Sequence, residues 1–106
     1  MNKYEYHSRI CSKLNDIYVR KNKDYGDSFA IVRKNIPNSV LVRLWDKLLR
    51  LNNLMQNNDN HLVDESIEDT LMDMANYCIM ELVERAVEVE REVNEHECNN
   101  GGSSTL

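Results

Sequence analysis

The sequence predicts an all-α fold: a small antiparallel bundle of three main helices and one short helix, in which the third main helix is the longest. Residues that form the turns between strands are scarce, since the 106 residues include one Pro and three Gly. The helix-favouring residues Leu, Glu, Lys, Arg and Met are abundant. A chain of this length supports one core, so we expect a single helical domain over residues 1–97. Residues 98–106 contain few apolar side chains and are expected to be disordered.

The first helix is predicted over about residues 6–21, because apolar residues recur at helical spacing between charged ones, at Ile10, Leu14, Ile17 and Tyr18. The following segment, KNKDYGDSF, breaks this pattern. Gly26 lacks the Cβ restriction, and the neighbouring Asp residues favour turns and caps. The sequence therefore predicts a turn here, followed by a short helix through residues 31–34 with Asp27 or Ser28 as its cap.

The second main helix is predicted over about residues 40–56. Pro37 separates it from the short helix, and Asn38 or Ser39 can cap it. Its apolar residues, which we expect to be buried, are Leu41, Leu44, Trp45, Leu48 and Leu51. Its basic residues lie together on a different face of the helix and are Arg43, Lys47 and Arg50. The polar stripe of this helix is therefore basic.

The third main helix follows a loop over residues 57–60, with Asn60 or Asp64 as its cap, and no helix breaker occurs before Asn99. It reaches roughly 30 residues and ~45 Å, which exceeds the length that the two shorter helices can cover. An apolar stripe nevertheless continues along its second half, at Leu82, Ala86, Val89 and Val93. Either a second chain buries this stripe, which predicts a homo-oligomer through the helices, or the valines are incidental on a charged, frayed end.

The segment DESIEDTLMDMANYCIME, residues 64–81, places acidic and amide groups along one stripe of this helix. At about 100° per residue, four side chains fall within roughly 80° of one another: Glu65, Asp69, Asp73 and Asn76. Carboxylates one turn apart repel each other unless water, basic side chains or a cation relieve the repulsion. The stripe is therefore either a Mg²⁺ site with Glu65, Asp69 and Asp73 as ligands or an ordinary solvated face.

The acidic stripe of the third helix and the basic stripe of the second are neighbours if the short loop makes these helices antiparallel. Phosphate is the ligand that requires both stripes. Carboxylates hold the Mg²⁺ that bridges phosphate oxygens, and Arg43, Lys47 and Arg50 neutralise the remaining charge. The alternative is direct ion pairing between the two stripes, which is structural and weakly stabilising.

The turn segment and the acidic stripe supply further groups that suit a nucleotide. Tyr25 either stacks on a base or fills the core, and Lys21 and Lys23 either contact a ligand or are simply exposed. The amide of Asn76 has both donors and acceptors for a base or sugar edge, and is otherwise solvated. The candidate nucleotide-binding residues are Lys21, Lys23, Tyr25, Arg43, Lys47, Arg50 and Asn76.

Several function classes have little support. The formal net charge of −5 argues against polymeric nucleic acid as a partner. Three distant cysteines without a CxxC pair argue against a zinc site, and we expect Cys11 and Cys78, on apolar stripes, to be reduced core residues. The three histidines have no apparent partner for a catalytic triad. No apolar run approaches ~18 residues and no leader precedes Tyr4, so we expect a cytoplasmic protein that does not enter membranes.

Three blocks, KNKDYGDSF, RLWDKLLRLNNL and ESIEDTLMDMANYCIM, in this order and spacing resemble the nucleotide modification associated domain, type one, which is common in bacteriophage genomes. The resemblance covers about Tyr18 to Glu81. It implies a phage protein of nucleotide metabolism or DNA modification that binds a small nucleotide in the bacterial host cell. The helical pattern is also similar to that of the MazG-type nucleoside triphosphate pyrophosphohydrolases.

In MazG-like enzymes, acids from two adjacent helices bind Mg²⁺ and activate a water that attacks the phosphate chain of a nucleotide. By position, this similarity implies Glu65, Asp69 and Asp73 as metal-binding and catalytic residues. The EExxE block of those enzymes is missing from the second helix, where Asp46 is the remaining acid. Two functions are therefore predicted: a Mg²⁺-dependent pyrophosphohydrolase, or a non-catalytic protein that sequesters a signalling nucleotide of host defence.

Overall fold

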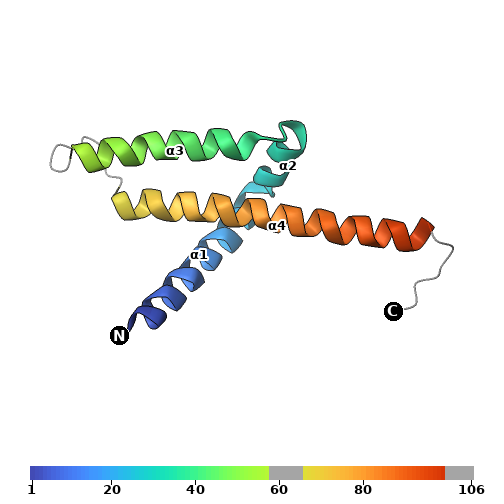
Figure 1. Ribbon diagram of the computed structural model, residues 1–106, viewed down its shortest axis with the longest axis horizontal. Coiled ribbons are helices and arrows are strands. Elements are labelled where there is room, and N and C mark those ends of the chain that lie inside the picture. Colours follow the sequence, from blue (N-terminus) through green and yellow to red (C-terminus); the bar gives the residue numbers. More distant parts are fainter. Residues whose placement is uncertain (58–65, 100–106) are drawn as a thin grey trace.

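Four helices and no strand make up the part of the chain that the computed structural model describes, residues 1–57 and 66–99. In chain order they are α1 (Lys3–Tyr25), α2 (Ser28–Asn35), α3 (Ser39–Gln56) and α4 (Ile67–Asn99) (Figure 1). The predicted all-α fold, with three main helices, a short helix and a long final helix, is confirmed. The start of α3 lies within one residue of its predicted position, and its end is as predicted.

α1 is longer than the apolar pattern predicted, because caps set its two ends. At the N-terminus, the Asn2 side chain accepts a hydrogen bond from the Glu5 amide at 2.9 Å. At the C-terminus, Gly26 adopts the left-handed conformation with φ of 60°, and its N–H donates to the Asn22 carbonyl. Asp27 is also left-handed, with φ of 57°. These two successive residues turn the chain from α1 into α2.

α4 begins with a reciprocal cap. The Asp69 amide donates to the Ser66 hydroxyl at 3.0 Å, and the Ser66 amide donates to the Asp69 carboxylate at 3.4 Å. The predicted caps, Asn60 and Asp64, lie outside the described residues. The helix extends for 33 residues, which corresponds to about 50 Å. It ends at Asn99 and so includes the start of the segment predicted to be a disordered tail.

α3 and α4 lie side by side and antiparallel, and they form the largest interface between helices (Figure 1). α1 crosses α4 near the middle of the long helix, and α2 connects α1 to the start of α3. The N-terminal half of α1 and the C-terminal half of α4 project from this centre. The radius of gyration is 18.4 Å, whereas a compact chain of this length has ~13 Å. None of the described helices is long and apolar enough to cross a bilayer.

The core formed by the described residues is small, and its large apolar side chains are Leu14, Phe29 and Leu54. The predicted burial of the apolar face of α3 is wrong for Leu41, Trp45 and Leu48, and Trp45 is 67% exposed. Leu44 and Leu51 are half-buried. The physical reason is that α3 directs Arg43 and Lys47 toward α4, where Arg43 meets the Tyr77 ring and Lys47 the Asp73 carboxylate.

Two further groups of residues are more accessible than a core position would be. Cys11 and Cys78 are free thiols but exposed, so the prediction that they belong to the core is wrong. On the second half of α4, the apolar stripe is exposed in the single chain at Leu82, Val89 and Val93. A homo-oligomer through this stripe stays a prediction.

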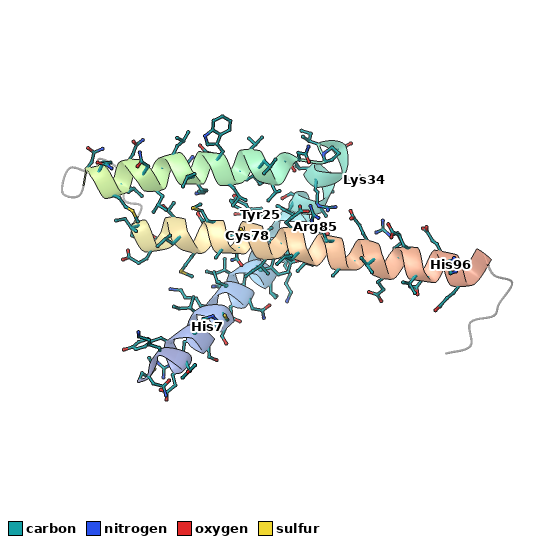
Figure 2. All side chains as sticks on the ribbon, in the orientation of Figure 1. His7, Tyr25, Lys34, Cys78, Arg85 and His96 are labelled. Carbon is teal, nitrogen blue, oxygen red and sulfur yellow. The ribbon has the colours of Figure 1, made fainter. Side chains whose placement is uncertain are left out.

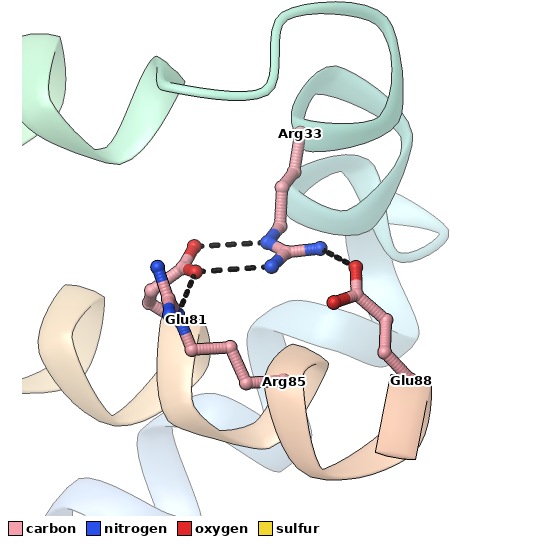
Figure 3. A network of polar contacts seen from close by, with 4 residues as sticks. All are labelled: Arg33, Glu81, Arg85 and Glu88. Atoms are coloured by element: carbon pink, nitrogen blue, oxygen red, sulfur yellow. Dashed lines mark hydrogen bonds and ion pairs between the residues drawn. The ribbon is translucent and has the colours of Figure 1, made fainter. Parts of the chain in front are cut away.

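An ion-pair network holds α2 against α4 (Figure 3). The guanidinium of Arg33 donates two hydrogen bonds to the Glu81 carboxylate, at 2.9 and 3.0 Å, and a third to Glu88. Arg85, one turn along α4, also donates to Glu81, at 2.7 Å. The Arg33 and Glu81 side chains are only 15% and 13% exposed. Hydrogen bonds from Arg33 lower the pKa of Glu81 to about 2, so this carboxylate stays charged well into the acid range.

Candidate functional site

The first of two adjoining cavities lies where the end of α1 meets α2, α3 and α4, and its volume is about 250 Å³. The second lies between α1 and α4, and its volume is about 440 Å³. Ile17, Lys21 and Asp73 line both cavities. The usual range for small-molecule sites is about 300–1,000 Å³, so the first volume lies just below this range and the second within it.

Aromatic rings dominate the first cavity. Phe29 of α2 and Tyr77 of α4 stack with their centroids 6.4 Å apart and their planes inclined by 19°. The Arg43 guanidinium, from α3, lies 5.4 Å from the Phe29 centroid and 5.5 Å from that of Tyr77. Tyr25 also lines the cavity and lies near the centre of the molecule, where the helices meet (Figure 2). Its ring is 66% exposed, so Tyr25 is not a core residue.

Tyr18 brings a phenol to the same cavity from α1. Burial raises the pKa of Tyr18, and the nearby carboxylates of Asp27 and Glu84 raise it further. The pKa of Glu84 is raised as well, first by burial and then by Asp27. Tyr18 therefore remains a neutral hydrogen-bonding group at any physiological pH.

Asn76 ties α4 to α1 beside this cavity. Its Nδ2 donates a hydrogen bond to the Leu14 carbonyl at 3.3 Å, and Leu14 is itself buried. The amide is half-buried and lines the first cavity. The sequence left open whether Asn76 binds a ligand or is simply solvated. In the structure it is not simply solvated, because its hydrogen bond positions α1 over α4.

Charged side chains of both signs surround the second cavity. Its basic residues, all from α1, are Lys13, Arg20 and Lys21. Its acidic residues, from α1 and α4, are Asp24, Asp69 and Asp73. Spacings of three and four residues place the α1 members on one helical face. The cavity can therefore accept an anion that contacts the basic side of α1.

The predicted metal ligands on α4 already have protein partners. Asp73 forms an ion pair with Lys47 of α3, with 2.9 Å between the carboxylate oxygen and Nζ. The Lys47 side chain is 12% exposed. Asp69 caps the helix through Ser66. Glu65 lies outside the described residues. Among residues 1–57 and 66–99, no group of three or more His, Cys, Asp or Glu side chains is arranged to hold a metal ion. Because Glu65 is not described, the Mg²⁺ site at Glu65, Asp69 and Asp73 stays a prediction.

The basic candidates separate into residues that line a cavity and residues that do not. Lys21 and Arg43 line the first cavity. Lys47 reaches its edge through the ion pair with Asp73. Arg50 forms an ion pair with Asp46 of its own helix at 3.3 Å, and neither Arg50 nor Lys23 lines either cavity. The sequence allowed direct ion pairing between the two stripes as the alternative to phosphate binding. Such a pair does occur, between Lys47 and Asp73.

A family model matches residues 21–84, which is more than half of the chain, and its description is nucleotide modification associated domain 1. The chain belongs to this family. The nucleotide modification associated domain 1 begins at Lys21, near the end of α1, and ends within α4. It includes every residue lining the first cavity except Ile17 and Tyr18. No curated protein and no solved structure matches the chain, and the MazG-like similarity stays a prediction.

Several cavity residues of this nucleotide modification associated domain 1 protein were not predicted from its sequence: Lys13, Tyr18, Arg20, Phe29 and Tyr77. A signal for the α1 members exists in the sequence. Lys13, Arg20 and Asp24 recur at intervals of seven and four, which are helical spacings. Phe29 and Tyr77 had no such signal, because their approach depends on how α2 packs against α4.

The histidines of the described chain lie away from both cavities. His7 is on the projecting half of α1, and His96 is near the end of α4 (Figure 2). The His7 Nδ1 atom is 3.7 Å from the Cys11 sulfur, one turn along the exposed helix. His61 lies outside the described residues. The two cavities therefore contain no described histidine as a general base.

Proposed function

We propose that this domain binds a nucleotide across the two cavities, with the base in the first and the phosphates in the second. The observation that carries the proposal is the division of chemistry between them. Aromatic rings line one cavity and three cationic side chains of α1 line the other. Lys21 belongs to both, so a ligand that spans the boundary contacts it in either orientation. Membership of the nucleotide modification associated domain 1 family supports a nucleotide over other anions.

The base half of the proposal rests on the exposed ring of Tyr25 and on the layer formed by Phe29, Arg43 and Tyr77. Stacking of a base on an aromatic side chain contributes about 1–3 kcal/mol and tolerates any base. The guanidinium of Arg43 offers a second planar surface or a bidentate contact to an acceptor. Asn76 and Tyr18 supply polar groups that can distinguish one base edge from another.

The phosphate half rests on Lys13, Arg20 and Lys21, which present three positive charges on one side of α1. Charge-assisted hydrogen bonds from such groups to phosphate oxygens are stronger than neutral ones. The carboxylates of Asp24, Asp69 and Asp73 lie around the same cavity. They would repel a phosphate that carried no cation, so added Mg²⁺ should tighten binding of a triphosphate more than binding of a monophosphate.

Calorimetric titration with nucleoside triphosphates, monophosphates, nucleosides and inorganic triphosphate tests the proposal. Tyr25→Ala should weaken binding of every nucleotide but leave inorganic triphosphate unaffected, whereas Lys21→Ala should weaken both by about tenfold. Two matched controls exist on α1: Tyr4→Ala removes an exposed tyrosine far from the cavities, and Lys23→Ala removes a lysine that lines neither. Binding that Tyr4→Ala or Lys23→Ala weakens as much as the cavity variants would reject this site.

Magnesium-dependent pyrophosphohydrolysis is the finer form of this proposal, and sequestration of an intact nucleotide is its alternative. The engagement of Asp73 by Lys47 and of Asp69 by the helix cap supports sequestration. Hydrolysis requires Glu65 to complete a set of metal ligands. Incubation with nucleotides and Mg²⁺, followed by chromatography of the denatured mixture, separates the two. Recovery of pyrophosphate that Asp69→Ala abolishes identifies the enzyme, and recovery of the intact nucleotide identifies the sequestering protein.

The ligand class depends on where the protein acts. A phage protein in the cytoplasm of a bacterial host meets two pools of nucleotides: the triphosphates of DNA synthesis and modification, and the signalling nucleotides of host defence. A competition titration between a deoxynucleoside triphosphate and cyclic dinucleotides distinguishes these pools. Tighter binding of the triphosphate favours a role in nucleotide metabolism.

A further inference from the structure

The side of α3 that faces away from α4 is largely apolar and exposed, and the exposed ion pair of Asp46 and Arg50 lies at its border. We call it the outer face of α3, and its apolar members are Leu41, Val42, Trp45, Leu48, Leu49 and Met55, each at least half exposed. α3 forms one edge of the molecule, and among the described helices only α4 runs alongside it (Figure 1). Side chains on this edge extend away from α4 (Figure 2). A contiguous apolar surface of this kind marks an interaction site.

We propose that a second copy of this chain covers the outer face of α3, so that two α3 helices pair antiparallel about a twofold axis near Leu48. Residues 41, 45, 48, 52 and 55 follow each other at intervals of four, three, four and three, which is the spacing of a helix seam that packs against another helix. An antiparallel pair about Leu48 places Leu41 of one chain near Met55 of the other. The same surface then serves both partners, as a twofold interface requires.

The position of Asn52 indicates that the outer face of α3 pairs with a second α3 helix and is not an apolar surface that arose by chance. It is the one polar residue within the seam, and it is exposed in the single chain. In the antiparallel pair, Trp45 of one chain lies within one residue of the level of Asn52 of its partner. The indole N–H is a donor and the Asn amide oxygen an acceptor, so both polar groups can be satisfied together. A single Asn in an apolar seam also fixes the register of paired helices.

Charge distinguishes this face from the other exposed apolar stripe, on the second half of α4. That stripe consists of small side chains after Leu82, and the helix around it carries six glutamates between residues 84 and 97 and two arginines. Two copies paired there bring like charges together, which costs free energy. The outer face of α3 has larger side chains, and the exposed charges beside it, Asp46 and Arg50, are of opposite sign and pair with each other. It is therefore the better surface for a second copy.

Light scattering and the fluorescence of Trp45, the single tryptophan of the chain, test the proposal on the full-length protein. The wild type should elute at twice the 12.5 kDa chain mass, and its tryptophan emission should shift to longer wavelength on dilution as the indole becomes solvated. Leu48→Lys should elute as a monomer with red-shifted emission at all concentrations. Val89→Lys is the matched control, because Val89 is similarly exposed, and it should remain a dimer.

Circular dichroism of each variant establishes that the helices are intact, and Leu41→Lys provides an independent disruption of the same face. A monomeric wild type would overturn the proposal. So would a Leu48→Lys protein that stays dimeric, or dissociation caused by Val89→Lys and not by Leu48→Lys. A wild-type monomer whose tryptophan emission changes only with lipid vesicles would assign the face to a membrane surface instead, and would also overturn it.

Discussion

The two sides of α3 differ in which residues the chain covers: two basic residues face α4, whereas most of the large apolar residues of the helix are exposed. The inner side, toward α4, carries Arg43 against two aromatic rings and Lys47 in an ion pair with Asp73 at 2.9 Å. The outer face carries large apolar residues, with the exposed pair of Asp46 and Arg50 at its border. An amphipathic pattern therefore identifies two faces of a helix but does not tell which face the chain covers itself. Here Arg43 and Lys47 turn inward because they have specific partners on the neighbouring helices.

The inner side differs from the outer side in the kind of contact as well as in burial. Phe29 is buried and links the inner side of α3 to α2 and α4 through Arg43 and Tyr77. Ion pairs on exposed surfaces contribute little to stability. We therefore expect the free energy of unfolding to depend most on Phe29, then on the part-buried pair of Arg33 and Glu81, and least on exposed single ion pairs.

Phe29→Ala should have the largest effect on the inner side, with a loss of about 3 kcal/mol in the free energy of unfolding, because it leaves a cavity beneath Arg43 and Tyr77. The control is Ile31→Ala on the same helix, where the side chain is exposed and the expected loss is about 0.5 kcal/mol. Urea unfolding followed by circular dichroism at one protein concentration measures both. Equal losses for the two variants would show that Phe29 does not anchor the inner side.

Glu81→Gln should have the next largest effect, a loss of about 2 kcal/mol, because it replaces two hydrogen bonds of a charged pair and leaves Arg33 with Glu88 alone. Glu88→Gln is the control. The Glu88 carboxylate is half exposed, so its loss should cost less. A larger loss of unfolding free energy for Glu88→Gln would show that Glu88, and not Glu81, is the main partner of Arg33.

The same network predicts a dependence of stability on pH. The pKa of Glu81 is about 2 in the folded protein and 4.5 ordinarily, so the folded state holds this carboxylate charged over a range in which the unfolded state protonates it. The stabilisation is complete above about pH 5 and is lost as the pH falls toward 2. Urea midpoints at several pH values should fall over this range in the wild type and fall less in Glu81→Gln.

The order, number and type of the helices were predictable because apolar spacing and the scarcity of Gly and Pro report local structure. The ends of α1 were not, because Asn2 and Gly26 set them through capping hydrogen bonds. The buried face of α3 was not predictable either. Its placement depends on contacts with Asp73 and Tyr77, which are distant from α3 in the sequence. The local spacing of residues within α3 does not report such contacts.

The candidate site was predictable to the extent that its residues share a helix face. Asp73 and Asn76, one turn apart on α4, line the same cavity as Lys21 and Tyr25 from the end of α1. Lys13 and Arg20 were missed because basic residues at helical spacing are also usual on a solvated helix face. Their spacing from Asp24 marks a shared helix face but not what that face meets, and only the crossing of α1 over α4 turns it toward Asp69 and Asp73.

Lys47→Met should have the smallest effect on the inner side, a loss of about 1 kcal/mol, because it leaves the Asp73 carboxylate without its partner while keeping the length of the side chain. Arg50→Met removes a cation from the same helix, but the pair it breaks with Asp46 is exposed at both side chains. Its expected loss is below about 0.5 kcal/mol. Urea unfolding compares the two variants under identical conditions. If Arg50→Met lowers the free energy of unfolding as much as Lys47→Met, the ion pair on the inner side of α3 is no more stabilising than the exposed pair. If Lys47→Met costs more, the ion pair with Asp73 accounts for part of the preference of α3 for its basic face.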